Sequence, residues 1–316
     1  MGFVIPLTVT FISFVLFLLF FLVDCSFAWG PGMHSFITMS IPLAKISSSI
    51  AQLCGKYYHN FVWGSLMADM IIGKNLSNWD YHPHNWQVIL RIFYKAKEDF
   101  LKAFMIGYMV HLAQDIIAHN FMVPDFILFS AFSPRLRGGI SLLHLKVEAE
   151  AEKFVPRETW EKISELKSLP DNKLCERFLE ENLKGTIISS ARANGKIYEK
   201  ALTLNIIKES IRSKIIKFLR TDNLLSFIIS EYADMARKTS EEFIKNFERS
   251  KLLDFDPTGI ESIYISYSLK KSVEKIRKRK NGNGVEPAKF FRVLREFQPP
   301  IFGNRIPVLF MLKKSL

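Results

Sequence analysis

The sequence predicts an all-α fold, and three observations favour that class. Apolar residues recur at three- and four-residue spacings along almost the whole chain after residue 28, as they do in amphipathic helices. No segment shows the sustained alternation of apolar and polar residues that is typical of strands. The 316 residues are 48% hydrophobic and 13% aromatic, which excludes a disordered chain and permits a sizeable core.

Residues 1–28 have the pattern of an export signal. Residues 3–23 carry no charge, Asp24 ends this apolar run, and the small-x-small sequence SFA precedes Trp29. We therefore expect an exported protein, secreted or periplasmic, whose mature chain begins at Trp29. An apolar run of about 20 residues can also span a bilayer, so the alternative is an uncleaved N-terminal membrane anchor.

Four helical segments are predicted after this signal. Their apolar spacing favours helices over residues 34–54, 57–72, 86–121 and 141–154, of which 86–121 is either one long helix or two shorter ones. Turn-forming residues favour a loop around Asn78, Asp80 and Pro83. A second loop is expected over residues 122–140, which contain two prolines and the pair Gly138-Gly139.

The C-terminal half is predicted to contain additional helices. We expect four or five of them between residues 157 and 280, with breaks near Pro170, Asn194-Gly195, Thr221-Asp222 and Pro257. The net charge of +12 is concentrated in residues 270–280, which contain seven basic side chains and one Glu. A solvated helix end explains this cluster most simply, and attraction to anionic lipid head groups or nucleic-acid phosphates is the alternative.

Cysteine usage restricts the kind of metal site. Cys25 lies in the signal, which leaves Cys54 and Cys175 as either one disulfide or two buried thiols. Two cysteines are too few for a cysteine-based zinc site. Any metal must therefore be held by histidine and carboxylate ligands.

The seven histidines are confined to one part of the chain. All of them lie between residues 34 and 144, and the last 172 residues contain none. Histidines distributed by chance would seldom cluster in this way. We therefore expect the chemistry in the N-terminal half and a scaffold or partner surface in the C-terminal half.

The sharpest motif is His111-x3-Asp115-x3-His119, within GYMVHLAQDIIAHN. Steps of four residues place all three side chains on one helix face, among mostly apolar neighbours. Burying three ionisable groups is costly unless something pairs with them, and zinc accepts both imidazole and carboxylate. Hydrogen-bonded core residues are the alternative explanation of the motif taken alone.

The length of this motif indicates more than one metal. His111 and His119 are about 12 Å apart along the helix axis, whereas a zinc–nitrogen bond is about 2 Å long. One ion can hardly be reached by both imidazoles. We expect at least two ions, with Asp115 close to both or bridging them.

Other segments offer further ligands. His144-x3-Glu148 is a second pair one helical turn apart, and Asp69 is a carboxylate inside an apolar segment. The remaining candidates are the imidazole of His82 or His84, the imidazole of His34, and a free α-amino group at Trp29.

Together these residues resemble the zinc-dependent phospholipase C family, which includes bacterial phosphatidylcholine-preferring phospholipases and clostridial alpha-toxin. The fungal zinc-dependent single-strand nucleases are more distant relatives. The family pattern is an N-terminal Trp with a nearby His, a Gly-Ser-x-x-x-Asp turn, a lone His, an HxxxD helix with another His, and a final HxxxE. The matching residues, over about 120 positions, are Trp29, His34, Gly64-Ser65 with Asp69, His84, His111, Asp115, His119, His144 and Glu148.

The resemblance implies three Zn²⁺ ions. One would be held by Asp69, His84, His111 and Asp115, with His82 as the alternate to His84. A second would be held by His119, His144 and Glu148, and the third by Trp29, His34 and Asp115. His119 lies four positions after Asp115, whereas the corresponding interval in the best-known family members is six positions. We therefore expect the second site to be displaced. The sequence also lacks an acidic residue between Trp29 and His34 and the β-sandwich domain of alpha-toxin.

The resemblance also implies the organisation and the reaction. We expect a zinc-binding catalytic region over residues 29–155, a helical region of the same or an appended domain over 156–262, and a basic helix end with a loose tail over 263–316. The expected reaction is phosphodiester hydrolysis by metal-activated water, as in a phospholipase C acting at a phospholipid membrane surface, with Asp69 as the catalytic carboxylate. No obligatory protein partner is implied. The alternatives are an exported zinc-dependent nuclease, for which nucleic acid is the less favoured partner, and a non-catalytic metal-binding, membrane-associated protein.

Overall fold

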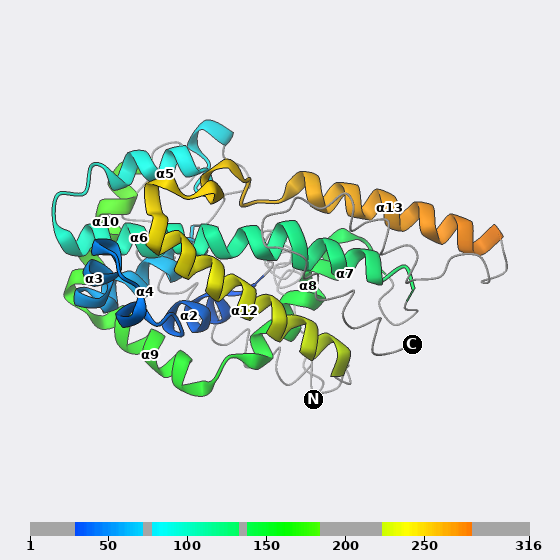
Figure 1. Cartoon of the computed structure of the whole chain (residues 1–316), viewed down its shortest axis with the longest axis horizontal. Helices are drawn as coiled ribbons and strands as arrows, with labels where there is room; N and C mark the ends of the chain where they lie inside the picture. Colours follow the sequence, from blue (N-terminus) through cyan, green and yellow to red (C-terminus); the bar gives the residue numbers. More distant parts are fainter. Residues whose placement is uncertain (1–28, 72–77, 133–137, 184–222, 280–316) are drawn as a thin grey trace, which may run out of the picture.

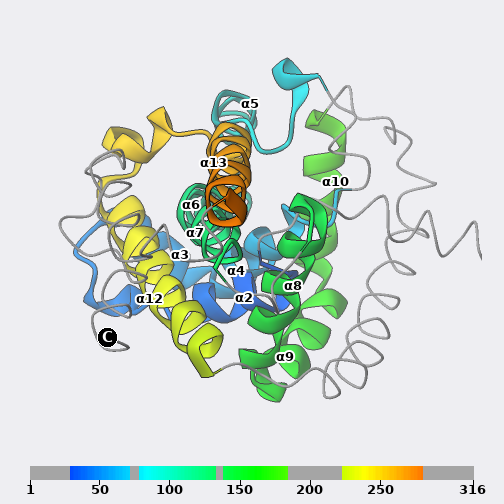
Figure 2. The ribbon, with the colours of Figure 1, turned by 90° about the vertical axis from the view of Figure 1, so that its right-hand side faces the viewer.

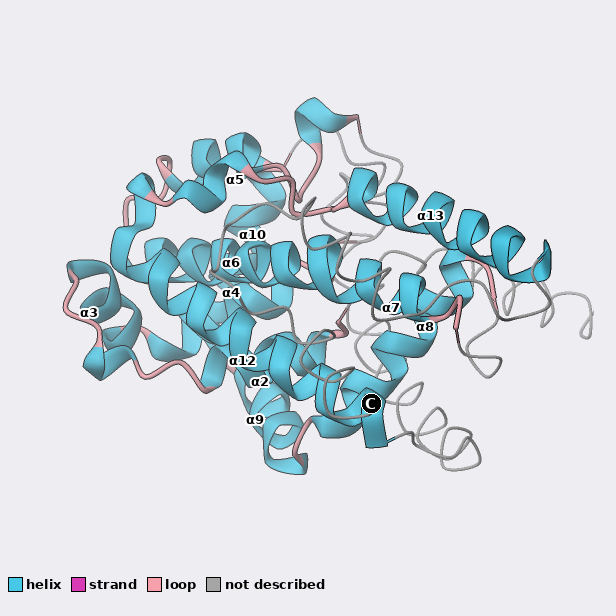
Figure 3. Cartoon of the chain, turned by 45° about the vertical axis from the view of Figure 1, so that its right-hand side comes forward, coloured by secondary structure: helices cyan, strands magenta, loops and turns pink. Residues whose placement is uncertain are grey.

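Every regular element in the described residues is a helix, which confirms the all-α prediction (Figures 1 and 3). The structure, a computed structural model, describes residues 29–71, 78–132, 138–183 and 223–279. The α-helices are α2 (Pro31–Met39), α3 (Ser49–Lys56), α4 (Tyr58–Met67), α5 (Trp86–Phe93), α6 (Asp99–Ile117), α7 (Val123–Phe129), α8 (Ile140–Ala151), α9 (Arg157–Ser168), α10 (Pro170–Asn182), α12 (Asn223–Asn246) and α13 (Ile260–Arg279). Short 3₁₀ turns occur at Leu43–Lys45, Trp79–Tyr81, Glu152–Phe154, Phe247–Arg249 and Lys251–Asp254.

Helix α6 forms the centre of the bundle. Figure 2 shows α6 and α7 end-on, with α12 on one side, α8 and α9 on the other, and α5 and α2 above and below. The most extensive contacts of α6 are with α4 and α12. Sixteen of its 19 residues are buried, so nearly its whole circumference is covered by other helices.

The run Asp99–Phe129 is long and apolar enough to cross a membrane by length and composition. Among the described residues it is the one helix that meets this test. In the fold, 89% of the most apolar 18-residue stretch of this run is buried inside the protein. The run is therefore covered by the bundle as a core helix is.

Two glycines allow α4 and α6 to cross at very short range. A Cβ atom on Gly64 would lie 1.8 Å from the carbonyl oxygen of Phe104, and one on Gly107 would lie 1.8 Å from that of Phe61. Only residues without a side chain fit at such a backbone contact. This close approach brings the end of α4, where Asp69 follows, against the face of α6 that carries His111.

The structure corrects two predicted elements. The single helix expected over residues 34–54 is instead α2, a 3₁₀ turn and α3, because Pro42 cannot continue a helix and Ser48 caps a new one by accepting a hydrogen bond from the Ala51 amide. Part of the loop expected over 122–140 is helix α7. A π-helical turn at Ala118–Met122 joins α6 to α7, and Pro124 lies in the first turn of α7, where a missing N–H is tolerated.

The other predicted boundaries agree with the described residues. Residues 86–121 contain two helices, and α8 occupies most of 141–154. Breaks at Pro170 and Pro257 fall before α10 and α13, whereas those near Asn194-Gly195 and Thr221-Asp222 lie outside the described residues. The predicted export signal, residues 1–28, also lies outside them.

Packing determines the state of the two cysteines. It also corrects part of the interpretation of residues 270–280 as a solvated helix end. Cys54 and Cys175 are both buried free thiols, so the disulfide alternative is wrong. Lys271 and Lys275 on α13 are exposed, as expected of a solvated helix end. Lys270, by contrast, is 3% exposed and donates a hydrogen bond to the carbonyl oxygen of Gly138.

Candidate metal centre

The centre of the site is Asp115, on the buried face of α6. Its side chain lies among four imidazoles from three parts of the chain. Oδ2 is 3.1 Å from Nε2 of His111 and 3.2 Å from Nε2 of His84. Oδ1 is 3.3 Å from Nε2 of His34 and 3.6 Å from Nε2 of His119. Each carboxylate oxygen therefore faces two histidines, as expected of a carboxylate that is shared between two ions.

Asp69 and His34 enter the same centre from α4 and α2. Asp69 follows the C-terminal end of α4, and its Oδ1 lies 3.5 Å from Nε2 of His111. Its Oδ2 lies 3.9 Å from Nε2 of His34. The rings of His34 and His111 stack with their centroids 3.8 Å apart. Three segments that are distant in sequence thus meet at one buried cluster.

The loop before α5 brings His84 to Asp115. His84 is 4% exposed and reaches Asp115, whereas His82 is half-buried. Nδ1 of His82 accepts a hydrogen bond from the backbone amide of His84, and its ring stacks on that of Trp79. His82 therefore supports the loop that positions His84.

The second predicted group gathers at the other end of the motif. His144 and Glu148 lie one turn apart on α8, and both are buried. The ring of His144 meets that of His119 edge to face at a centroid distance of 5.3 Å. Helix α8 thus brings its candidate ligands to His119.

His119 does not lie in a regular α-helix. It belongs to the π-helical turn Ala118–Met122, which inserts extra backbone between α6 and α7. Neighbouring Asn120 donates a hydrogen bond to the carbonyl oxygen of Asp256 and accepts one from Ser262. Gly259, with a φ of 55°, packs directly against the His119 backbone. The start of α13 therefore holds the turn that carries His119.

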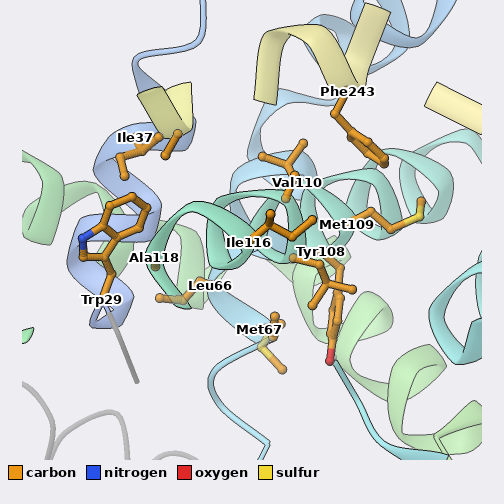
Figure 4. Packing of buried hydrophobic residues seen from close by; sticks show 14 of the residues in the cluster. Trp29, Ile37, Leu66, Met67, Tyr108, Met109, Val110, Ile116, Ala118 and Phe243 are labelled. Atoms are coloured by element: carbon orange, nitrogen blue, oxygen red, sulfur yellow. The ribbon is translucent and has the colours of Figure 1, made fainter. Parts of the chain in front are cut away.

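Trp29 lies beside the cluster at the first described position. It is fully buried, its ring centroid is 5.7 Å from that of His34, and its Nε1 donates to Sδ of Met122. Figure 4 shows it with Ile37 next to the end of α6 near Ala118. The indole of Trp29 thus lies beside His34, which itself lies against Asp115.

The donor set fits metal ions. The described residues provide no hydrogen-bond partner for Nε2 of His34, either ring nitrogen of His111, or Oδ2 of Asp115, although all are buried. Donor atoms of His34, Asp69 and His111 lie within 4.8 Å of one another, as do those of His84, His111 and Asp115. Buried imidazole and carboxylate atoms in such groups are the ligands that zinc prefers.

The charges around the site keep the carboxylate of Asp115 ionised. Burial alone would raise the pKa of Asp115, but the charge of the neighbouring His111 holds it well below its usual value. Burial would lower the pKa of His34, yet Asp115 and Asp69 raise it overall. Burial and these two carboxylates raise the pKa of Tyr108 well above 10, so its hydroxyl stays protonated.

Sequence reasoning missed three polar residues that support the site. Tyr108 donates a hydrogen bond to the carbonyl oxygen of Pro83 and so anchors the His84 loop. Glu152 is buried and accepts a hydrogen bond from the amide of Met33 at the start of α2. Gln114 is fully buried and contacts His34. Of the three, Gln114 could have been identified from the sequence, because it is an uncharged polar residue inside the apolar run between His111 and Asp115.

One comparison with known proteins gave a match. A family model described as zinc dependent phospholipase C matches residues 36–242, which is well over half of the chain. No curated protein and no solved structure matches the chain.

Proposed function

Because the chain belongs to the zinc-dependent phospholipase C family, we propose that it hydrolyses phosphodiesters and cleaves the head groups of phospholipids. The observation that carries the proposal is Asp115, whose two oxygens each face two imidazoles at 3.1–3.6 Å. A carboxylate inside a ring of imidazoles suits a multi-metal centre.

The ligand sets that we propose follow the two oxygens of Asp115. Oδ2 would serve one ion together with His84, His111 and Asp69, and Oδ1 would serve another with His34 and Trp29. His119, His144 and Glu148 would form the remaining site. When bound, zinc supplies positive charge that polarises a phosphoryl group and lowers the pKa of a water molecule.

Asp69 is our candidate for the catalytic carboxylate. It comes from a turn, and its oxygens point between His34 and His111, at the border of two of the proposed sets. A carboxylate in that position can orient an attacking water and accept its proton at Oδ1 or Oδ2. Asp69→Asn should therefore abolish turnover, about 100-fold or more, with a modest loss of zinc. Unchanged activity in this variant would rule out the role.

A phospholipid surface is the partner that we propose. Of the seven exposed large hydrophobic side chains in the described residues, five belong to two segments that flank the site: Trp79, Tyr81, Ile260, Tyr264 and Ile265. The first segment leads into His84, and the second follows Gly259, which packs on His119. Tyr and Trp favour the interface between water and lipid. The exposed lysines of α13 would add attraction to anionic head groups.

We also propose that residues 1–28 direct export and that cleavage before Trp29 frees its amino group as a ligand. The burial of Trp29 beside His34 supports this proposal. Mass analysis of the native exported protein under non-denaturing conditions tests it. The expected mass corresponds to a chain that begins at Trp29 and carries three zinc ions, and an uncleaved chain would contradict it.

The decisive experiment uses phosphatidylcholine vesicles. The zinc-loaded protein should release diacylglycerol and phosphocholine, lose this activity with a zinc chelator, and regain it when zinc is restored. Single-stranded DNA is incubated in parallel. Cleavage of DNA without lipid hydrolysis would favour the nuclease alternative. Inactivity toward both substrates, with a full complement of zinc, would favour a non-catalytic metal-binding protein.

A further inference from the structure

A chain of buried hydrogen bonds connects Ser65 on α4 to His34 in the metal centre. Oε1 of Gln114 lies 2.8 Å from Nδ1 of His34, and Nε2 of Gln114 donates to Oγ1 of Thr38 at 2.9 Å. Oγ1 of Thr38 lies 2.8 Å from Oγ of Ser65. All four side chains are 0–1% exposed, so water does not compete for these bonds.

With the Gln114 amide oriented as the structure has it, this chain of hydrogen bonds assigns the protonated nitrogen of His34. The amide nitrogen of Gln114 is engaged with Thr38, so the amide oxygen faces the imidazole. A carbonyl oxygen only accepts hydrogen bonds, and Nδ1 of His34 must therefore be the protonated donor. Nε2, 3.3 Å from Asp115, then carries the lone pair and could act as a metal ligand.

We propose that Gln114 is a positioning residue that sets the tautomer and ring orientation of His34 and thereby makes Nε2 a metal ligand. Thr38 and Ser65 hold the amide in the required orientation. Histidines that bind metals commonly donate their other N–H to an acceptor, and loss of that acceptor typically weakens metal binding 10–100-fold. The inference rests on the proposed zinc site but is independent of the substrate.

Without this acceptor, His34 would be free to adopt the other tautomer. A proton on Nε2 would form a hydrogen bond with Asp115, and the lone pair would then point away from the centre. The site would lose one ligand, although the imidazole stayed in place. A residue that merely filled space would have no such effect on the proton.

The test compares four full-length variants of the zinc-loaded protein. Gln114→Met preserves size but removes both hydrogen bonds, and Gln114→Glu keeps an acceptor for His34. Thr38→Val removes the hydroxyl that orients the amide. Met105→Leu is the matched control, a buried conservative change on the same helix. Zinc content is measured by native mass spectrometry and zinc affinity by chelator competition.

We expect Gln114→Met to bind one zinc fewer per chain, or one zinc 10–100-fold more weakly. Gln114→Glu should retain the wild-type count, Thr38→Val should lie between, and Met105→Leu should match the wild type. Nitrogen NMR of ¹⁵N-histidine-labelled protein gives a second readout, with His34 assigned from its absence in His34→Asn. The Nδ1–H signal of His34 should be protected from exchange in the wild type and lost in Gln114→Met.

Two results would overturn the inference. One is a wild-type zinc count and affinity in Gln114→Met, and the other is a loss in Gln114→Glu equal to that in Gln114→Met. If Gln114→Met does not fold, Thr38→Val and Gln114→Glu decide the question by the same measurements. The assay contains no phospholipid, so failure of the proposed phospholipase C activity would not affect its outcome.

Discussion

At the scale of single residues, the site depends on ionisable groups placed where water cannot reach them. Asp115 and His111 are almost fully buried, and each carries polar atoms that the described protein leaves without hydrogen bonds. Such burial is costly unless another charge compensates for it. Metal ions bound to these imidazole and carboxylate atoms would compensate for that cost.

Substitution of Asp115 should affect more than one ion. Asp115→Asn removes the negative charge and one of the two acceptor oxygens that face four imidazoles. Even outer partners of ligands contribute 10–100-fold, so zinc affinity should fall by more than about 100-fold. Measurement of zinc content after dialysis checks this prediction. Asp171→Asn, on the exposed surface of α10, is the control and should keep its zinc.

A carboxylate away from the metal centre should make stability depend on pH. Burial raises the pKa of Glu176 to about 7, although Trp63 donates a hydrogen bond to it. Between about pH 4.5 and 7 the unfolded chain has lost a proton that the folded protein retains, so stability falls as pH rises. Glu176→Gln should therefore raise the melting temperature at pH 8 and change it little near pH 4.5. An equal shift at both pH values would contradict this, and exposed Glu181→Gln is the control.

At the scale of elements, the crossing of α4 and α6 and the π turn after α6 determine the geometry of the site. The crossing positions Asp69 against His111, and the π turn changes the direction of the chain at His119. The close helix crossing explains the glycine, Gly64, in the Gly-Ser-x-x-x-Asp motif. The π turn shows that residue spacing along the HxxxDxxxH motif does not give the position of His119, because the helix is irregular there.

Gly107→Ala should be strongly destabilising. The new Cβ would lie 1.8 Å from the carbonyl oxygen of Phe61, so the two helices would have to separate. Overpacking of this kind costs about 1–3 kcal/mol, or more where backbone must move. Chemical denaturation measures the change. Gly55→Ala on α3 is the matched control, because nothing lies within 4 Å of its new Cβ, and it should stabilise by up to about 1 kcal/mol.

At the scale of the whole molecule, the metal centre joins segments that have little other reason to meet. Ligand candidates come from α2, the end of α4, the loop before α5, α6, the π turn and α8. Ions bound only by the folded protein stabilise it by mass action. The proposed zinc ions would therefore act as tertiary cross-links as well as catalysts.

Removal of metal should lower the stability of the entire bundle. At a free zinc concentration of about 100 times the dissociation constant, one site contributes about 2.7 kcal/mol. A chelator should therefore lower the melting temperature in a single cooperative transition, and added zinc should restore it. Calorimetry with and without the chelator makes the measurement. An unchanged melting temperature would exclude zinc as a structural component.

The sequence by itself determined the helical class, the family and the candidate ligands. These features are local, since helical periodicity and the HxxxDxxxH and HxxxE spacings are written in neighbouring residues. Tertiary structure alone shows that His84 reaches Asp115, because a contact between this loop and α6 is not written in neighbouring residues. It also decided the π turn at His119 and the contacts of Gln114. Each depends on contacts between residues far apart in the chain, which no local pattern encodes.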